Sequence, residues 1–128
     1  MTSKSLTLQV SFPPSVNTYW QFNGSRRFLT KNAVAFKQQV RNEFIASKHK
    51  GFDRQRLMVR IELSPPDKRR RDIDNYAKSL IDALCQAGIF VDDEQIDLLT
   101  IVRCEQKKSG LCQVRIEPLD CQQGITEA

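Results

Sequence analysis

Two proline pairs, each at the end of a run of alternating apolar residues, constrain what this chain can fold into. Apolar side chains occupy every second position from Leu6 to Phe12 before Pro13-Pro14, and again from Leu57 to Leu63 before Pro65-Pro66. Alternation with a period of two is typical of a strand buried on one face. Proline ends such a strand because it has no N–H to donate. The sequence therefore predicts two half-buried strands, each followed by a corner.

Two helices are predicted, one after each of these strands. Apolar residues recur at helical spacing from Ala33 to Phe44, and Thr30 is placed to cap this first helix. A second helical pattern runs from Ile73 to Ala87, and Gly88 follows it where helices commonly end. Residues 15–28, rich in Asn, Arg and aromatic side chains, are predicted to form an ordered loop.

Two more strands are predicted, around residues 99–101 and 114–116. The polar segment 107–110 fits a turn, which predicts that these two strands form a hairpin. The expected order is β-α-β-α-β-β, an α+β fold in which a small mixed β-sheet packs with two helices. A chain of 128 residues has the size of one domain. We assign residues 1–119 to that domain and residues 120–128 to a C-terminal tail.

Charge is distributed unevenly along the chain. Residues 1–71 contain 15 Lys and Arg against 4 Asp and Glu, whereas residues 72–128 contain 5 against 11. Cationic side chains release the counterions condensed on nucleic acids, and carboxylate oxygens are preferred ligands of Mg²⁺. The split fits a basic half that binds a polyanion and an acidic half that holds divalent cations. Uneven solvation of an ordinary surface is the alternative.

The cysteines and the histidine argue against a structural zinc site. Cys85, Cys104, Cys112 and Cys121 include no Cys-x-x-Cys pair, and His49 is the only histidine. The first ten residues lack the apolar run of a signal peptide, and about 18 apolar residues never occur in succession. We therefore expect free thiols, a cytoplasmic location and no membrane partner.

The segment Arg69-Arg70-Arg71-Asp72-Ile73-Asp74 places three arginines against two aspartates. Carboxylates spaced by one residue lie on the same side of an extended chain but on nearly opposite sides of a helix. We predict that Asp72 precedes the helix and that Asp74 lies in its first turn, with Asp74 or Asn75 as the cap. The positive end of the helix dipole would then stabilise these carboxylates or a bound phosphate.

Lys78 follows Asp74 by four residues, so both side chains can lie on one helix face. One interpretation is an exposed ion pair, worth about 0.3–0.5 kcal/mol. The other is a lysine that stabilises charge on a reacting phosphate. Asn75 is open in the same way, between a helix cap and a ligand.

Asp92 and Asp93 follow the connection Gly88-Ile89-Phe90-Val91. One of them reaches the start of the second helix only if Gly88 permits a tight reversal of the chain. A solvated turn, or a cap for residues 94–97, is the alternative. Sequence spacing does not decide between these interpretations.

A carboxylate cluster next to arginines suits hydrolysis of a nucleic-acid backbone. Three carboxylates around one or two Mg²⁺ ions would leave metal positions open for water and a phosphodiester oxygen. The arginines would counter the repulsion between these acids and the DNA. Arg71 is expected to contact the scissile region, whereas Lys68, Arg69 and Arg70 are expected to follow flanking phosphates. Ordinary solvation of the basic run is the alternative.

These residues resemble the RusA-type Holliday junction resolvases, small phage-related endonucleases that cut four-way DNA junctions. The resemblance spans about residues 6 to 118. Its elements are Phe12-Pro13-Pro14-Ser15 with Asn17, the segment Pro66 to Asn75, Lys78, and Asp82-Ala83-Leu84 running into Ala87-Gly88 and Val91-Asp92-Asp93. An arginine-rich Asp-x-Asp-Asn segment with a following lysine and a downstream Asp-Asp is more specific than any one motif alone.

The resemblance implies a homodimeric, Mg²⁺-dependent endodeoxyribonuclease of DNA recombination and repair, bacterial or phage-encoded, in which Mn²⁺ would substitute. It implies catalytic and metal-binding carboxylates at Asp72, Asp74 and Asp93, with Lys78 assisting. The residues that would bind four-way junction DNA are Lys68, Arg69, Arg70, Arg71 and Lys78. Paired nicks are also implied, because a two-fold dimer matches the approximate two-fold axis of the junction. Neither a cleavage sequence preference nor a role for the tail can be transferred.

Three other function classes compete with this interpretation. A response-regulator-like phosphoacceptor domain needs an acidic pair after its first strand, where this chain has Phe12-Pro13-Pro14. A non-catalytic basic DNA-binding module would bind without Mg²⁺ and would not cut. A general Mg²⁺-dependent nuclease would cut plain duplex DNA as well as junctions. Tyr19 and Trp20 could stack on bases or pack in the protein, and His49 is expected at the surface.

Overall fold

The computed structural model of this chain describes residues 5–16, 20–23 and 26–119, with the backbone alone at 20–23 and 26–28. The tail assigned to residues 120–128, Tyr19 and the side chain of Trp20 lie outside this description. In chain order the elements are β1 (Leu6–Val10), β2 (Trp20–Asn23), β3 (Arg26–Leu29), α2 (Lys31–Ser47), β4 (Leu57–Ser64), α3 (Ile73–Gln86), the 3₁₀ turn η1 (Asp93–Gln95), β5 (Ile96–Arg103) and β6 (Leu111–Pro118).

Four strands form the main sheet in the order β1-β6-β4-β5. Strand β6 runs antiparallel to both β1 and β4, whereas β5 runs parallel to β4. This mixed sheet, with helices between its strands, confirms the predicted α+β fold. The predicted hairpin between the last two strands is wrong, because β4 lies between β5 and β6. The turn at 107–110 is present, but a turn does not decide which strands pair.

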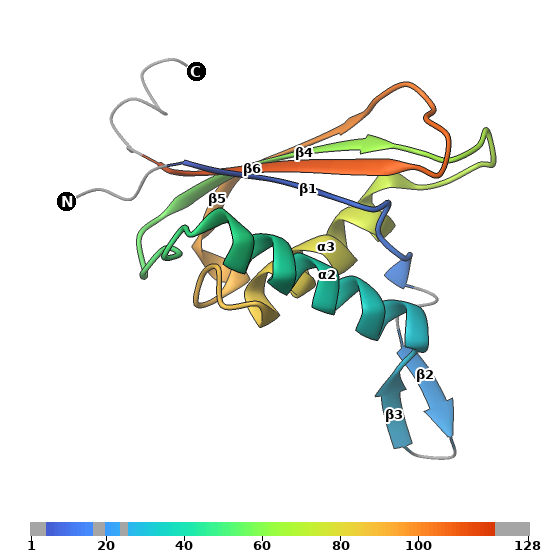
Figure 1. Cartoon of the computed structure of the whole chain (residues 1–128), viewed down its shortest axis with the longest axis horizontal. Coiled ribbons are helices and arrows are strands. Elements are labelled where there is room, and N and C mark those ends of the chain that lie inside the picture. The colour runs from blue at the N-terminus through green and yellow to red at the C-terminus, as the bar shows by residue number, and fades with distance from the viewer. Residues whose placement is uncertain (1–4, 17–19, 24–25, 120–128) are drawn as a thin grey trace.

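Strands β2 and β3 form a second sheet, paired antiparallel from Trp20↔Leu29 to Asn23↔Arg26. The sequence predicted an ordered loop here, because these short strands are too brief to establish an alternating pattern. In Figure 1 the hairpin projects away from the main sheet, beyond the start of α2.

Both helices lie on one side of the main sheet (Figure 1). The alternating side chains of β4 are fully buried there, in one core with Leu80 and Leu84 of α3. Thr30 caps α2 as predicted, since its Oγ1 accepts a hydrogen bond from the Ala33 N–H at 3.3 Å. None of the described helices is long and apolar enough to cross a bilayer. In the described part, Cys85, Cys104 and Cys112 are free thiols, as expected.

The start of α3 is where the chain leaves the extended conformation. Asp72 has φ −91° and ψ 115°, and Asp74 lies in the first turn, as predicted. The N-cap position is occupied by Asp72 and not by Asp74 or Asn75, and the Asp72 side chain makes no capping hydrogen bond. The prediction missed this because helical periodicity locates a helix end only to within a residue or two.

Candidate active site

A cleft of about 340 Å³ opens between α3 and β5. Its charged lining residues are Asp74, Lys78, Asp82 and Asp93, and its apolar lining residues are Ala77, Ile81, Leu99 and Ile101. Asp74, Lys78 and Asp82 are spaced by four residues, so they follow one face of α3 turn by turn. The structure therefore brings together three of the four residues predicted to be catalytic, namely Asp74, Lys78 and Asp93.

Asp72 is not among the residues that line this cleft. It is exposed and extended, one residue before α3 begins. The adjoining backbone is tied to the end of β5, because Arg103 Nη2 donates to the Arg71 carbonyl at 2.8 Å. This bond holds the start of α3 beside the sheet, and a metal-binding role for Asp72 stays a prediction.

The chain reverses at Gly88, between the end of α3 and the turn that carries Asp93. Its φ of +85° is in the left-handed region, which favours glycine. The Gly88 N–H donates to the Cys85 carbonyl at 3.0 Å, and the Ile89 N–H donates to the Leu84 carbonyl at 3.2 Å. This pair of bonds is the Schellman arrangement that ends a helix tightly. The tight turn on which the position of Asp93 depended is therefore present.

Asp92 and Asp93 have separate positions, so both interpretations of this pair hold in part. Asp92 is the N-cap of η1 and accepts a hydrogen bond from the Glu94 N–H at 3.2 Å. That bond and a side-chain hydrogen bond with Asp93 lower the pKa of Asp92. Asp93 lines the cleft, and its pKa is raised, first by the hydrogen bond of its protonated form to Asp92 and then by burial and by the Asp92 charge. Asp93 is thus the acid of the pair that faces the other cleft residues.

Asp82 is a cleft residue that sequence reasoning did not select. It appeared only as part of the resemblance, although its spacing of four from Lys78 was a usable signal. Burial raises the pKa of the Cys85 thiol, and the negative charge of Asp82 adds to that shift. The Asp82 charge also adds to the raised pKa of Asp93. The cleft therefore holds more negative charge than the two predicted aspartates alone supply.

The four basic residues before α3 differ in exposure. Lys68, Arg69 and Arg70 are exposed. The Arg71 side chain is only 8% exposed, and its Nη1 donates to Asp67 Oδ1 at 2.8 Å. This pairing, with the Arg69 N–H, lowers the pKa of Asp67. The first three side chains are thus accessible to solvent whereas Arg71 is packed against the protein, and the predicted DNA contacts of all four stay untested.

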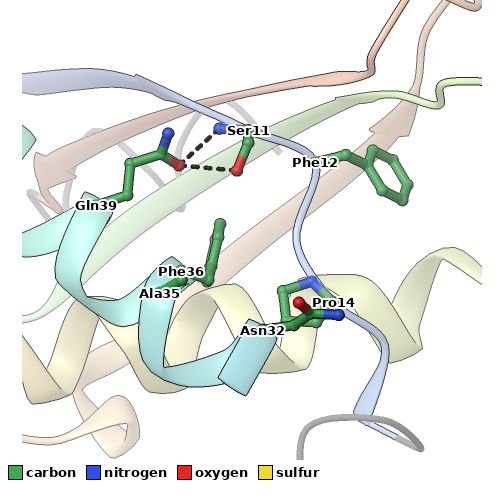
Figure 2. Close-up of a pocket in the computed structure, with 7 residues that line it drawn as sticks. All are labelled: Ser11, Phe12, Pro14, Asn32, Ala35, Phe36 and Gln39. Carbon is green, nitrogen blue, oxygen red and sulfur yellow. Dashed lines mark hydrogen bonds between the residues drawn. The ribbon is translucent and has the colours of Figure 1, made fainter. Parts of the chain in front are cut away.

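Phe12, which precedes the proline pair Pro13-Pro14, packs its ring against the Arg71 guanidinium. Its ring lies 5.4 Å from the Arg71 guanidinium carbon and 4.9 Å from the centre of the Tyr76 ring. Figure 2 shows the corner attached to α2 by Gln39, whose Oε1 accepts from the Ser11 N–H at 2.9 Å and from the Ser11 hydroxyl at 2.8 Å. The Arg71 side chain therefore packs on the partly buried rings of Phe12 and Tyr76.

The donor chemistry of the cleft fits Mg²⁺. Its possible ligands are carboxylate oxygens, and Mg²⁺ is usually held by one or two carboxylates together with water and substrate phosphates. Across the residues that the structure describes, no three Asp, Glu, His or Cys side chains already converge on one metal position. The fit of Asp74 and Asp93 to Mg²⁺ is thus one of donor chemistry and not of a preformed metal position.

Known proteins are similar in sequence to this chain over most of its length. The family model described as endodeoxyribonuclease RusA matches residues 11–117. The chain is similar to the crossover junction endodeoxyribonuclease rusA of Enterobacteria phage HK97, with 34% identity over 109 residues, 85% of this chain and 91% of that relative. The namesake in Enterobacteria phage 82 is 31% identical over 109 residues, with the same shares. That of Escherichia coli (strain K12) is 34% identical over 119 residues, 91% of this chain and 95% of the relative. With the fold and cleft described above, this match shows that the chain belongs to the RusA family of endodeoxyribonucleases.

Proposed function

We propose that this protein is a structure-selective endodeoxyribonuclease that resolves Holliday junctions by paired, symmetric, Mg²⁺-dependent phosphodiester hydrolysis. The observation that carries the proposal is the cleft in which Asp74, Lys78 and Asp93 meet, from segments on either side of the Gly88 reversal. Relatives that match at least 85% of the chain are named crossover junction endodeoxyribonucleases, which supports junction DNA as the substrate.

The four residues predicted to be catalytic, and two apolar residues of the cleft, each have a chemical task in this proposal. Asp74 and Asp93, with Asp72 at the start of α3, hold the metal. Bound Mg²⁺, or Mn²⁺ in its place, supplies an activated water and polarises the phosphodiester. The Lys78 ammonium binds a non-bridging phosphate oxygen and stabilises the charge that grows in the transition state. The apolar side chains of Leu99 and Ile101 limit water on one wall, which strengthens these charge interactions.

The exposed basic residues before α3 bind the DNA backbone beside the cleft. Lys68, Arg69 and Arg70 would neutralise flanking phosphates and release their counterions. The N-terminus of α3 adds backbone N–H groups and a positive dipole end at the same place. Arg71, which is paired with Asp67, holds the shape of the segment.

We propose a homodimer in which β5 lies at or near the contact between subunits. This strand is an edge of the main sheet. Two of the five large apolar side chains that are exposed in the described residues, Leu98 and Leu99, lie on it, and a third, Val91, lies in the connection before η1. Apolar residues gathered at a sheet edge favour covering by another chain. A second copy is the fitting partner, because paired cutting of a two-fold junction needs two related sites.

The test compares cleavage of a four-way junction, the matching duplex and the matching single strand, each with and without Mg²⁺. We expect paired cuts in the junction with Mg²⁺ alone and little cutting of the other two substrates. Glu43→Gln, an exposed change on α2 away from the cleft, serves as the activity control. Equal cutting of duplex would indicate a general nuclease, and binding without any cutting would indicate a DNA-binding module.

The dimer is tested separately by sedimentation of the wild-type protein and of Leu98→Glu. We expect a two-chain species for the wild type and a shift towards one chain for the variant, since a charge would replace an apolar contact. Ile45→Glu, at an exposed apolar position on α2, is the matched control and should not dissociate the dimer. Equal dissociation of both variants would move the contact away from β5.

A further inference from the structure

Gln95 is a buried polar residue directly behind the acidic turn. It is 3% exposed, and it ends the η1 turn that begins at Asp93. Of the described residues, only Ser64 and Ser79 are also buried and polar. Burying an amide costs free energy unless its hydrogen bonds are satisfied, so the contacts of this side chain explain why it can be there.

The Gln95 side chain makes four hydrogen bonds, two in each direction. Its Oε1 accepts from the Val91 N–H at 2.8 Å and from the Asp92 N–H at 2.9 Å. Its Nε2 donates to the Asp53 carbonyl at 2.6 Å and to the Gln55 carbonyl at 2.8 Å. A primary amide has two N–H donors and two lone pairs on its oxygen, so this one is fully used.

The two bonds from Nε2 join segments that are about 40 residues apart in the sequence. The oxygen side completes the capping box of η1, a local role that many turns have. The nitrogen side has no such local role, because it attaches the turn to the backbone that leads into β4. Gln95 therefore fixes the turn relative to the main sheet and not only its internal shape.

Arg56, the residue after Gln55 in the same segment, also holds this turn. Its Nη2 donates to the Glu94 carbonyl at 2.6 Å, and its guanidinium pairs with Asp97 at the start of β5 at 2.6 Å. The Arg56 side chain is 38% exposed, so its ion pairs are screened by solvent more than the buried amide bonds of Gln95. The amide bonds of Gln95 are consequently the attachment that solvent screens less.

We propose that Gln95 is a positioning residue for the nuclease reaction, which holds the 91–93 backbone so that the Asp93 carboxylate stays in the cleft that Asp74 and Lys78 also line. This inference rests on the proposed function and deepens it. Reacting groups must be held to within about 0.5 Å of their productive geometry. An exposed carboxylate on a 3₁₀ turn has little packing of its own to hold it, and Gln95 acts directly behind it.

The primary variant is Gln95→Glu, which keeps the size of the side chain and the two acceptor contacts but removes both donors. We expect kcat for junction cleavage to fall about 10–100-fold, the range for residues that orient metal ligands. The KM for the junction and its affinity without metal should change by less than about twofold, because the basic residues before α3 are untouched. If Gln95 only stabilised the fold, the variant would have a lower melting temperature but would not show a reduced kcat with an unchanged KM.

A second readout does not depend on activity. Amide NMR shifts of Asp74 and Asp93 are followed while Mg²⁺ is added to the DNA-free protein. We expect the Mg²⁺ concentration at half-saturation to rise in Gln95→Glu, and hydrogen exchange at the Val91 and Asp92 amides to become faster. Gln9→Glu, the same chemical change at an exposed position on β1, is the matched control and should change none of these quantities.

Arg56→Gln extends the test to a variant that leaves the buried amide intact, and we expect the same split with a smaller loss of kcat. Unchanged kcat and unchanged half-saturation in folded Gln95→Glu would overturn the inference. If that variant does not fold, unchanged kcat and half-saturation in Gln95→Met, a neutral side chain of similar size that lacks all four hydrogen bonds, would do the same. If the wild-type protein cuts no junction, the proposed function fails, and the Mg²⁺ titration and hydrogen exchange still decide whether Gln95 positions Asp93.

Discussion

The basic segment, residues 68–71, and the acidic turn, residues 91–95, lie at the two ends of α3 and are held in different ways. Three of the four basic side chains are exposed, and only Arg71 is packed against the protein. In the acidic turn the exposed acids are carried on a backbone that Gln95 and Arg56 attach to the sheet. Binding a flexible polyanion tolerates mobile charges, whereas ligating a metal needs fixed ones. The two segments should therefore respond differently to substitution.

The largest expected effect is loss of cleavage in Asp74→Asn, by about 10³-fold, because a neutral amide replaces the carboxylate that we propose as a metal ligand. Junction binding without metal should be retained. Asp72→Asn is predicted to fail in cleavage as well, and its comparison with Asp74→Asn is informative because Asp72 lies outside the cleft lining. Cleavage rates under single-turnover conditions measure both. Normal cleavage by Asp72→Asn would remove that residue from the site.

Lys78→Gln should lower kcat by about 100-fold, since one charged donor to the transition state is lost. The loss should persist at saturating junction and at raised Mg²⁺, because the lysine is not a ligand. Lys107→Gln, at the exposed turn before β6, is the control. A change in KM alone would place Lys78 with the binding residues of the basic segment.

The double variant Arg69→Ala/Arg70→Ala should weaken junction binding and reduce the slope of log affinity against log salt by about 2, one for each lost phosphate contact. Its kcat should remain close to that of the wild type. Lys107→Ala/Lys108→Ala removes equal charge elsewhere and should leave the slope unchanged. An unaltered slope in the arginine variant would place these side chains off the interface.

Arg71→Ala should act mainly on stability. We expect the free energy of unfolding to fall by about 1 kcal/mol, the scale of a partly desolvated cation–ring contact such as that with Phe12. Denaturant unfolding measures this change, with exposed Arg70→Ala as the control. If Arg71→Ala instead changed the salt slope as much as Arg69→Ala, the predicted phosphate contact of Arg71 would be supported.

The smallest effect concerns acid stability. The pKa of Asp67 is lowered in the folded state by Arg71, so the contribution of Asp67 is present above its unfolded pKa of about 3.9 and is lost as pH falls through the lower folded value. The melting temperature of Asp67→Asn should therefore lie slightly below that of the wild type at pH 7 and meet it as the pH falls below about 4. A difference that persisted at lower pH would assign it to packing.

Much of the fold followed from local patterns. The period-two runs located β1 and β4, and Thr30 and Gly88 marked the helix ends at which they were expected. Local patterns did not predict which strands pair, so the hairpin of the last two strands was wrong and the β2–β3 hairpin was missed. Strand pairing depends on contacts between distant segments, which a pattern within one segment does not contain.

Only part of the candidate site was predicted, because sequence patterns report relations within one segment and not contacts between distant segments. Asp74 and Lys78 are related by helix geometry, so their common face could be read from spacing. Asp82 shares that spacing, but an acid further along a helix is usually solvated and so was passed over. Gln95 and the pairing of Arg71 with Asp67 carried no strong sequence signal, because a buried amide and an ion pair look like ordinary polar residues until their surroundings are known.

By itself, the sequence determined the order of the two helices and the four main-sheet strands along the chain, the position of Asp74 in the first turn of α3, and the resemblance to a family of junction endonucleases. Periodicity and adjacent charges are local properties, and a sequence records them directly. Only the tertiary structure decided that Asp93 lines one cleft with Asp74 and Lys78. It likewise decided that Asp92 caps the η1 turn and that the Arg71 side chain is buried against Asp67. Those outcomes depend on the reversal at Gly88 and on bonds across some 40 residues, where packing of distant segments sets the geometry.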